Sequence, residues 1–170
     1  MNRLAGKVAI VTGATQGQGE AHARGIVAEG GRVLVTGVNQ DKGASVVSEL
    51  GAHARYQHLD VVDPKGWADA VEWGGGLDLL VNNAGILIYG GVEEQRPEDY
   101  RRILDINVTG SFLGIQAAAP VVERAAGGVG MVRIRVAPGL ELPSRVDVAA
   151  EVGDSSLQQR SHCRQQRMER

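Results

Sequence analysis

Short runs of apolar, mostly β-branched residues alternate with longer amphipathic segments along the first two thirds of the chain. Each short run is bounded by turn residues, which is typical of a buried strand, and each longer segment carries apolar residues at helical spacing. This alternation predicts a doubly wound parallel sheet with helices on both faces, a three-layer α/β/α fold. The predicted strands are residues 7–12, 32–37, 54–61 and 77–82, and the predicted helices are residues 19–29, 42–50, 64–73 and 97–122.

The pattern changes beyond residue 124. Residues 132–136 read VRIRV, an alternation that predicts a strand with one solvated face at the edge of the sheet. The last fourteen residues, 157–170, carry four Arg and four Gln with little apolar content, so we expect them to be disordered. We therefore divide the chain into a domain of residues 1–140 and an atypical tail of residues 141–170 that is expected to be disordered.

The composition narrows the class of protein. With 170 residues, 43% of them hydrophobic, the chain has the size of one domain with a substantial core. A net charge of −2 disfavours a general attraction to nucleic acid or to anionic membranes and favours small-molecule partners. The single cysteine, Cys163, cannot form an internal disulfide, and no signal-peptide pattern opens the chain, so we expect a cytoplasmic protein. The apolar stretches are too short to span a bilayer, and the histidines show no metal-ligand spacing.

Three glycines follow the first predicted strand. In VTGATQGQG, Gly13, Gly17 and Gly19 lie between that strand and the first helix. A loop that enters a helix presents N–H groups at the positive end of the helix dipole, and positions without a side chain let a pyrophosphate approach them. We expect Gly13 to permit the turn, Gly17 the close approach and Gly19 the packing of helix on strand. Thr12 and Thr15 are expected hydroxyl donors. The spacing G-x-x-x-G-x-G differs from G-x-G-x-x-G, so on this motif alone an ordinary glycine-rich turn remains open.

Two further motifs are predicted to reach the same edge of the sheet. LDVVD (residues 59–63) ends the third strand and NNAG (residues 82–85) ends the fourth. The order TGxxxGxG, Asp after the third strand, NNAG and then Asn107 resembles the short-chain dehydrogenase/reductase family, over roughly residues 3–124. Within the family, the chain is most similar to bacterial hydroxysteroid dehydrogenases and 3-oxoacyl-reductase-like members. The resemblance implies a Rossmann-like NAD(P)-binding domain in residues 1–140 and an oxidoreductase that acts on a hydroxyl or ketone.

The resemblance also assigns roles to individual residues. It implies that Asp60 bonds the adenine amine, that Val61 contacts adenine through its backbone, and that Asn107 holds a water in a proton relay. The NNAG residues would support the central strand and line the nucleotide pocket. The full set of candidate cofactor-binding residues is Thr12, Gly13, Thr15, Gln16, Gly17, Gln18, Gly19, Gly37, Val38, Asp60, Val61, Asn82, Asn83, Ala84 and Gly85.

The end of the second predicted strand bears on the choice of cofactor. A carboxylate there takes the ribose hydroxyls of NAD, whereas an arginine takes the 2′-phosphate of NADP. This chain has Gly37 and Val38 at that point and Gln16 in the glycine loop, and all three are uncharged. Because a phosphate without a cation is poorly compensated, the sequence favours NAD slightly over NADP. Asp41 and Lys42 are nearby charges whose position the sequence leaves open.

The resemblance implies a catalytic Ser and a Tyr-x-x-x-Lys pair that relay the substrate proton, and this chain lacks them in the required order. Its tyrosines are Tyr56, Tyr89 and Tyr100, and its lysines are Lys7, Lys42 and Lys65. IRVAPG (residues 134–139) is similar to a family segment that follows the missing block, which fits an internal deletion, and a changed reading frame is the alternative. We therefore expect a C-terminally truncated fold.

Two functions stand as alternatives. The first is an NAD(P)-dependent oxidoreductase impaired by the loss of its Ser, Tyr and Lys. The second is a catalytically inactive nucleotide-binding pseudoenzyme. A glycine-rich NTPase is disfavoured because no Lys-Ser/Thr follows the glycines. The expected partners are a dinucleotide, a small-molecule substrate if the chain is active, and a second copy of the chain through helix 97–122; no nucleic acid, membrane or metal partner is expected.

Overall fold

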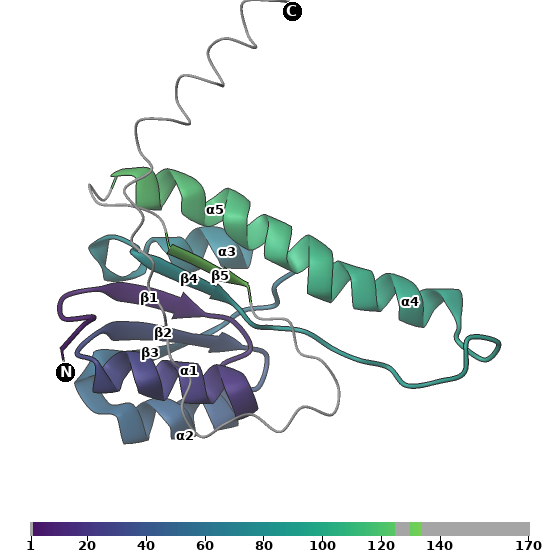
Figure 1. Cartoon of the computed structure of the whole chain (residues 1–170), viewed down its shortest axis with the longest axis horizontal. Helices are drawn as coiled ribbons and strands as arrows, with labels where there is room; N and C mark the ends of the chain where they lie inside the picture. The colour runs from purple at the N-terminus through teal and green to yellow at the C-terminus, as the bar shows by residue number, and fades with distance from the viewer. Residues whose placement is uncertain (1, 125–129, 134–170) are drawn as a thin grey trace, which may run out of the picture. The chain divides into compact units, whose positions relative to one another are not determined.

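A computed structural model of the chain describes residues 2–124 and 130–133, all within one unit that covers residues 1–138. Its centre is a parallel sheet in the order β3-β2-β1-β4-β5, so the order along the sheet reverses direction at β1 (Figure 1). The doubly wound fold predicted from the sequence is therefore confirmed. The strands are β1 (Val8–Val11), β2 (Arg32–Gly37), β3 (Ala54–His58), β4 (Leu79–Asn82) and β5 (Gly130–Arg133).

Helices cover both faces of this sheet. On one face lie α1 (Gly17–Ala28) and α2 (Gln40–Leu50), and on the other lie α3 (Pro64–Val71) and α5 (Gly110–Arg124) (Figure 1). Short 3₁₀ turns, η1 (Gly51–His53) and η2 (Trp73–Gly75), follow α2 and α3.

The central strands are buried on both faces because successive side chains point to opposite sides. In β2, Val33 and Val35 join the core beneath α1 and α2, whereas Leu34 joins the core beneath α3 and α5. In β1, Val11 joins the core beneath α1 and α2, and Ile10 joins the core beneath α3 and α5. Continuous apolar runs are what a parallel sheet covered by two helical layers requires, which is why the sequence pattern identified these strands.

The predicted helix over residues 97–122 is interrupted. It consists of α4 (Pro97–Leu104), a π-helical turn η3 (Asp105–Thr109) and α5, which ends at Arg124. A π turn inserts one extra residue per turn and is often found at functional sites. The prediction of a regular helix is wrong at this turn, which is the turn that carries Asn107.

β5 is the outermost strand on its side of the described sheet and pairs in parallel with β4, Leu79 opposite Gly130 and Asn82 opposite Arg133. Of the strand predicted at residues 132–136, residues 132 and 133 lie within β5. Residues 134–136 of that prediction, the segment IRVAPG, the predicted tail of residues 141–170 and Cys163 lie outside the described residues.

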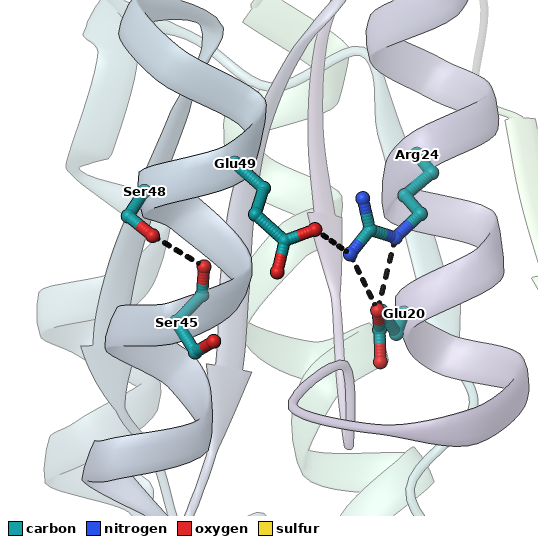
Figure 2. Close-up of polar contacts among 5 residues, drawn as sticks. All are labelled: Glu20, Arg24, Ser45, Ser48 and Glu49. Carbon is teal, nitrogen blue, oxygen red and sulfur yellow. Dashed lines mark hydrogen bonds and ion pairs between the residues drawn. The ribbon is translucent and has the colours of Figure 1, made fainter.

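The helices α1 and α2 are joined at their surfaces by Arg24. Its guanidinium donates to the carboxylate of Glu20 at 2.9 and 2.7 Å and to that of Glu49, on α2, at 2.7 Å (Figure 2). On α2 itself, Ser48 Oγ donates to the carbonyl of Ser45 (Figure 2). Exposed ion pairs contribute little to stability, so the two core clusters supply most of it and Arg24 only bridges the two helices at their surfaces.

Candidate functional site

The glycine loop runs from the end of β1 to the start of α1. Gly13 and Gly17 have φ of 61° and 59°, in the left-handed region that favours glycine. A Cβ at Gly19 would lie 2.4 Å from the carbonyl oxygen of Gly13 and 2.6 Å from Asn83 Nδ2, so only glycine fits there. Nothing lies within 4 Å of a Cβ built at Gly17, which leaves an open approach to the backbone at that point.

The N-terminus of α1 has no side-chain cap. Gln16 occupies the N-cap position with extended backbone, and its side chain makes no hydrogen bond to the first turn. The first N–H groups of a helix have no intrahelical partners, and they lie at the positive end of the helix dipole. The start of α1, around Gly17 and Gln18, therefore offers free donors to an anion.

Thr12 joins the glycine loop to the NNAG segment. Its hydroxyl accepts from the backbone N–H groups of Asn83 at 3.0 Å and Ala84 at 2.9 Å, and it donates to the carbonyl of Val81 at 3.3 Å. Asn83 Nδ2 in turn donates to the carbonyl oxygens of Thr12 at 2.8 Å and Gly13 at 3.3 Å. Thr12 is only 1% exposed. Its hydroxyl, expected from the sequence to face a phosphate, is instead used within the protein.

These bonds bring together the ends of β1 and β4, which are neighbours in the sheet. The strand order reverses between these two strands, and in open α/β sheets ligands bind beyond the carboxyl ends of the strands at such a switch point. The glycine loop and the NNAG segment are thus one hydrogen-bonded unit at the place where this fold binds ligands.

Asn107 holds the chain that follows the NNAG segment. Its Oδ1 accepts from the N–H of Ile86 at 2.8 Å, and its Nδ2 donates to the carbonyl of the same residue at 2.9 Å. Ser111 Oγ donates to the backbone carbonyl of Asn107 at 3.2 Å. A Cβ at Gly85 would lie 3.2 Å from Asn107 Oδ1, so the two segments are in close contact. The side-chain amide of Asn107 is therefore occupied by the backbone of Ile86.

Asn82, the first residue of NNAG, is buried beneath α5. Its Nδ2 lies 3.5 Å from the carbonyl of Ser111, and a Cβ at Gly114 would lie 2.9 Å from its Oδ1. Asn82 is 6% exposed. It supports the strand end rather than facing solvent.

The LDVVD segment reaches the same edge after β3. Asp60 is exposed, and its Oδ1 accepts from the N–H of Val62 at 3.2 Å. Val61 is buried, and its carbonyl accepts from Trp67 Nε1 at 2.8 Å. A Cβ at Gly110 would lie 2.5 Å from Val61 Cγ2. Trp67 and α5 thus hold this segment in place and leave the Asp60 carboxylate directed toward solvent.

The end of β2 is packed against the glycine loop. A Cβ at Gly37 would lie 2.9 Å from Thr15 Cγ2, and Thr15 is 8% exposed. The carbonyl of Gly37 accepts from Tyr56 Oη at 2.8 Å. Burial raises the pKa of Tyr56 above its ordinary value, so this hydroxyl stays protonated and donates. Val38, the next residue, is 66% exposed.

Sequence reasoning missed a contact between α2 and the glycine loop. Lys42 Nζ donates to Gln16 Oε1, and thereby links the first turn of α2 to the glycine loop. Asn39 Oδ1 caps α2 by accepting from the N–H of Lys42 at 3.0 Å. An asparagine directly before a helix signals such a cap, but no sequence pattern indicates that the Lys42 side chain turns toward Gln16.

Two polar atoms on one side of α1 have no hydrogen-bond partner among the described residues. They are Gln18 Oε1 and His22 Nε2, and both atoms are buried. Burial lowers the pKa of His22, which keeps its imidazole neutral near pH 7.

The described residues contain no group of three or more His, Cys, Asp or Glu placed to hold a metal ion. Among the helices that the structure describes, none combines the length and the apolar character needed to cross a bilayer.

Comparisons with known proteins agree with this geometry. The chain is 45% identical over 130 residues to a 3-alpha-(or 20-beta)-hydroxysteroid dehydrogenase of Mycobacterium tuberculosis, which covers 74% of this chain and 50% of that protein. It is 38% identical to a trans-4-hydroxycyclohexanecarboxylate dehydrogenase of Sinomonas cyclohexanicum (75% and 54% covered). It is 36% identical to a 3-beta-hydroxysteroid dehydrogenase of Comamonas testosteroni (75% and 52% covered). The chain thus spans about half the length of the curated relatives it matches.

The family model described as short chain dehydrogenase matches residues 7–135, a range that includes the glycine loop, the NNAG segment and Asn107. With that match over most of its length, and with the sheet order and loop geometry described above, the chain belongs to the short-chain dehydrogenase family.

Proposed function

We propose that this chain binds a nicotinamide dinucleotide at the crevice between the ends of β1 and β4. The observation that carries the proposal is the glycine loop, in which Gly13 and Gly17 adopt left-handed backbone and the N-terminus of α1 is left uncapped. An uncapped helix N-terminus with an open approach is suited to a pyrophosphate. Gly19 supports the same assignment because it allows α1 to start directly against the glycine loop.

The other predicted residues fit a dinucleotide around that centre. Asp60 is an exposed acceptor suited to an adenine amine, and Ala84 and Gly85 follow β4 at the switch point. Thr12, Asn82 and Asn83 would act through the backbone that they hold. When bound, a nicotinamide dinucleotide supplies a hydride acceptor or donor. The residues of this chain contribute binding, orientation and the packing that fixes the pocket.

The proposed chemistry is oxidoreduction of a hydroxyl or a ketone. The names of the relatives, two hydroxysteroid dehydrogenases and a hydroxycyclohexanecarboxylate dehydrogenase, support an alicyclic alcohol or ketone as the substrate class. Oxidation of an alcohol needs a group that takes the hydroxyl proton, and reduction needs one that gives it. The alternative is nucleotide binding without turnover. This alternative is favoured because the printed sequence has no tyrosine after Tyr100 and no lysine after Lys65, and so no Tyr-x-x-x-Lys pair.

For the finer choice of cofactor we keep the slight preference for NAD over NADP. The support is that Gly37 and Val38 carry no charge at the end of β2. Without a carboxylate at that point, discrimination between the two cofactors rests on weaker contacts. A cytoplasmic location stays a prediction from the sequence.

Self-association through the long helix is also a proposal. Four apolar side chains recur every fourth residue along α4, η3 and α5 and remain exposed: Tyr100 (57%), Leu104 (39%), Val108 (50%) and Phe112 (57%). Residues four apart share one face of a helix, so they form a stripe, which we call the α4–α5 stripe. A contiguous exposed apolar surface of this kind favours a protein partner, here a second copy of the chain.

Titration with NADH followed by fluorescence tests the binding proposal. Replacing Gly17 by leucine would place a side chain over the N–H groups of α1, so we expect dissociation constants at least tenfold higher. Gly25→Leu is the matched control, because Gly25 lies on the same helix, is exposed, and has nothing within 4 Å of a Cβ. Circular dichroism checks that both variants fold. Equal NADH affinity in the two variants would remove the glycine loop from the site.

Turnover separates the two candidate functions. NADH absorbance is followed with purified protein and a panel of ketosteroids, 3-oxoacyl thioesters and simple secondary alcohols. Because general acid–base catalysis contributes about 10²–10⁴-fold, we expect activity near background if no residue relays the proton. Robust turnover with any substrate of the panel would refute the pseudoenzyme alternative.

A further inference from the structure

We propose that Lys42 is the residue that receives a 2′-phosphate on the adenosine ribose, so that the site admits NADP with an affinity close to that for NAD. This inference rests on the proposed dinucleotide site and concerns its adenosine end. It explains why the preference for NAD is expected to be slight.

The first step concerns the position that excludes NADP in NAD-specific sites. There, a carboxylate at the end of the second strand bonds the ribose hydroxyls and repels a phosphate. Gly37 occupies this position, and a Cβ would meet Thr15 Cγ2 at 2.9 Å. Because Thr15 is buried, it has little freedom to move aside. The space from which an excluding carboxylate would extend is therefore filled by the glycine loop.

The second step concerns how firmly Lys42 is held beside that position. Tyr56 donates its hydroxyl to the carbonyl of Gly37 at 2.8 Å, and its ring lies so close to α2 that a Cβ at Gly43 would be 2.1 Å from Cδ2. Asn39 Oδ1 caps the same helix through the N–H of Lys42. One aromatic ring and one cap thus fix the first turn of α2 relative to the end of β2.

The third step concerns the side chain itself. Lys42 Nζ donates to Gln16 Oε1, so the ammonium of this α2 residue lies against the glycine loop. Gln16 is neutral, and none of the ion pairs found among the described residues includes Lys42. Its positive charge is therefore available to an anion. Both side chains are exposed, so a phosphate can replace the amide as the partner of the ammonium.

A lysine ammonium binds phosphate as a compact point charge with three donors. A 2′-phosphate brings up to two negative charges to the adenosine ribose, where the hydroxyl of NAD brings none. Removal of the Lys42 charge is therefore expected to weaken NADP strongly and NAD little. This selective effect distinguishes a residue that reads the 2′-phosphate from one that only supports the fold.

The test compares dissociation constants of NADH and NADPH for the wild type, Lys42→Gln and Lys42→Arg. We expect Lys42→Gln to raise the NADPH constant at least tenfold and the NADH constant less than twofold, and Lys42→Arg to restore NADPH binding. Lys65→Gln is the matched control, since Lys65 is exposed in the first turn of α3 and its N–H is capped by Asp63 in the same manner. It is expected to change neither constant.

A second probe isolates the adenosine end. Adenosine 2′,5′-bisphosphate competes with NADH through its phosphates, and we expect Lys42→Gln to weaken this competition while competition by 5′-AMP is unchanged. Equal losses for both cofactors, or no loss for NADPH, would overturn the assignment of Lys42. Wild-type protein that binds NADH but excludes NADPH would overturn this inference alone. Wild-type protein that binds neither would overturn the proposed dinucleotide site with it.

Discussion

Replacing Thr12 by valine isolates the hydroxyl that joins the glycine loop to the NNAG segment. Valine has nearly the same shape as threonine but no hydroxyl. The change leaves the N–H groups of Asn83 and Ala84 without the acceptor that they have at 3.0 and 2.9 Å. The carbonyl of Val81 keeps a partner, because it also accepts from the N–H of Thr12 at 3.0 Å. The N–H of Asn83 keeps a partner too, because it also donates to the carbonyl of Val81 at 3.1 Å. The change therefore removes one hydrogen bond from Asn83 and leaves one donor, the N–H of Ala84, without a partner.

The magnitude follows from the unpaired N–H of Ala84 and the lost hydrogen bond of Asn83. A buried donor left without a partner costs about 1–3 kcal/mol. Ala84 is only partly buried, so we take the lower part of that range, about 1–2 kcal/mol, for its N–H. The hydrogen bond lost by Asn83 adds its net value of about 1 kcal/mol, so we expect a loss of ~2–3 kcal/mol in the free energy of unfolding. A typical domain has only about 5–15 kcal/mol of stability, so the loss is large enough to be measured without ambiguity.

Thr36→Val is the matched control. Thr36 is fully buried and its hydroxyl donates to the carbonyl of Val11 at 3.1 Å, but no N–H group depends on it. We expect this variant to lose about 1 kcal/mol, the net value of one hydrogen bond. Thr12→Ser keeps the hydroxyl and loses only a methyl group, about 0.8 kcal/mol.

Urea unfolding monitored by circular dichroism measures all three variants, and NADH titration measures their binding. We expect Thr12→Val to be the least stable and to bind NADH most weakly, since the glycine loop would lose its attachment to the end of β4. If Thr12→Val and Thr36→Val lose the same stability, the reasoning that Thr12 holds the NNAG segment through its hydroxyl is refuted.

Three further predictions concern pH and association. Burial lowers the pKa of His22, so as the pH falls the unfolded chain takes up a proton, near the ordinary pKa of about 6.5, before the folded chain does, and stability falls below that pH. The urea midpoint of His22→Gln should therefore change less between pH 7 and 5.5 than that of the wild type. An equal change in the two proteins would contradict this. Burial tends to raise the pKa of Asp78, but hydrogen bonds from Lys7 Nζ and a backbone N–H outweigh the effect of burial, so the pKa is lowered. The stability that the Asp78 carboxylate contributes is present above its unfolded pKa of about 3.9 and is lost as the pH falls below that value. The melting temperature of Asp78→Asn should therefore decline less than that of the wild type between pH 5 and 3. If the α4–α5 stripe mediates self-association, Phe112→Glu should reduce the mass found by light scattering. Val92→Glu should not, because Val92 is 92% exposed but lies outside the stripe; equal masses for the two variants would rule out the stripe.

The sequence by itself determined the architecture. The apolar runs of β1 and β2 are continuous because both faces are buried, and Gly13 and Gly17 stand where the chain between β1 and α1 takes left-handed backbone. The order of motifs was sufficient to indicate the family. These features are local, since burial pattern and backbone freedom act within one strand or one turn of the chain.

Local reasoning could not predict the π turn that interrupts the long helix. The apolar spacing over residues 97–122 agrees with a helix, and the π turn at Asp105–Thr109 adds only one residue to one turn. Such an insertion leaves the composition of the segment unchanged. It is seen only in the backbone of residues 105–109, the turn from which the Asn107 side chain bonds both the N–H and the carbonyl of Ile86.

Only the tertiary structure shows which polar side chains of the candidate site are hydrogen-bonded within the protein and to which partners. Thr12 was expected to face a ligand, but it is bonded to Asn83, 71 positions away in the chain. The sequence left the direction of the Lys42 side chain open, and the structure shows it in contact with Gln16 of the glycine loop, 26 positions away. A sequence pattern reports which residues are buried and where the backbone can turn. Partners between distant segments are set by the order and register of the strands, which bring the ends of β1, β2 and β4 to one edge of the sheet.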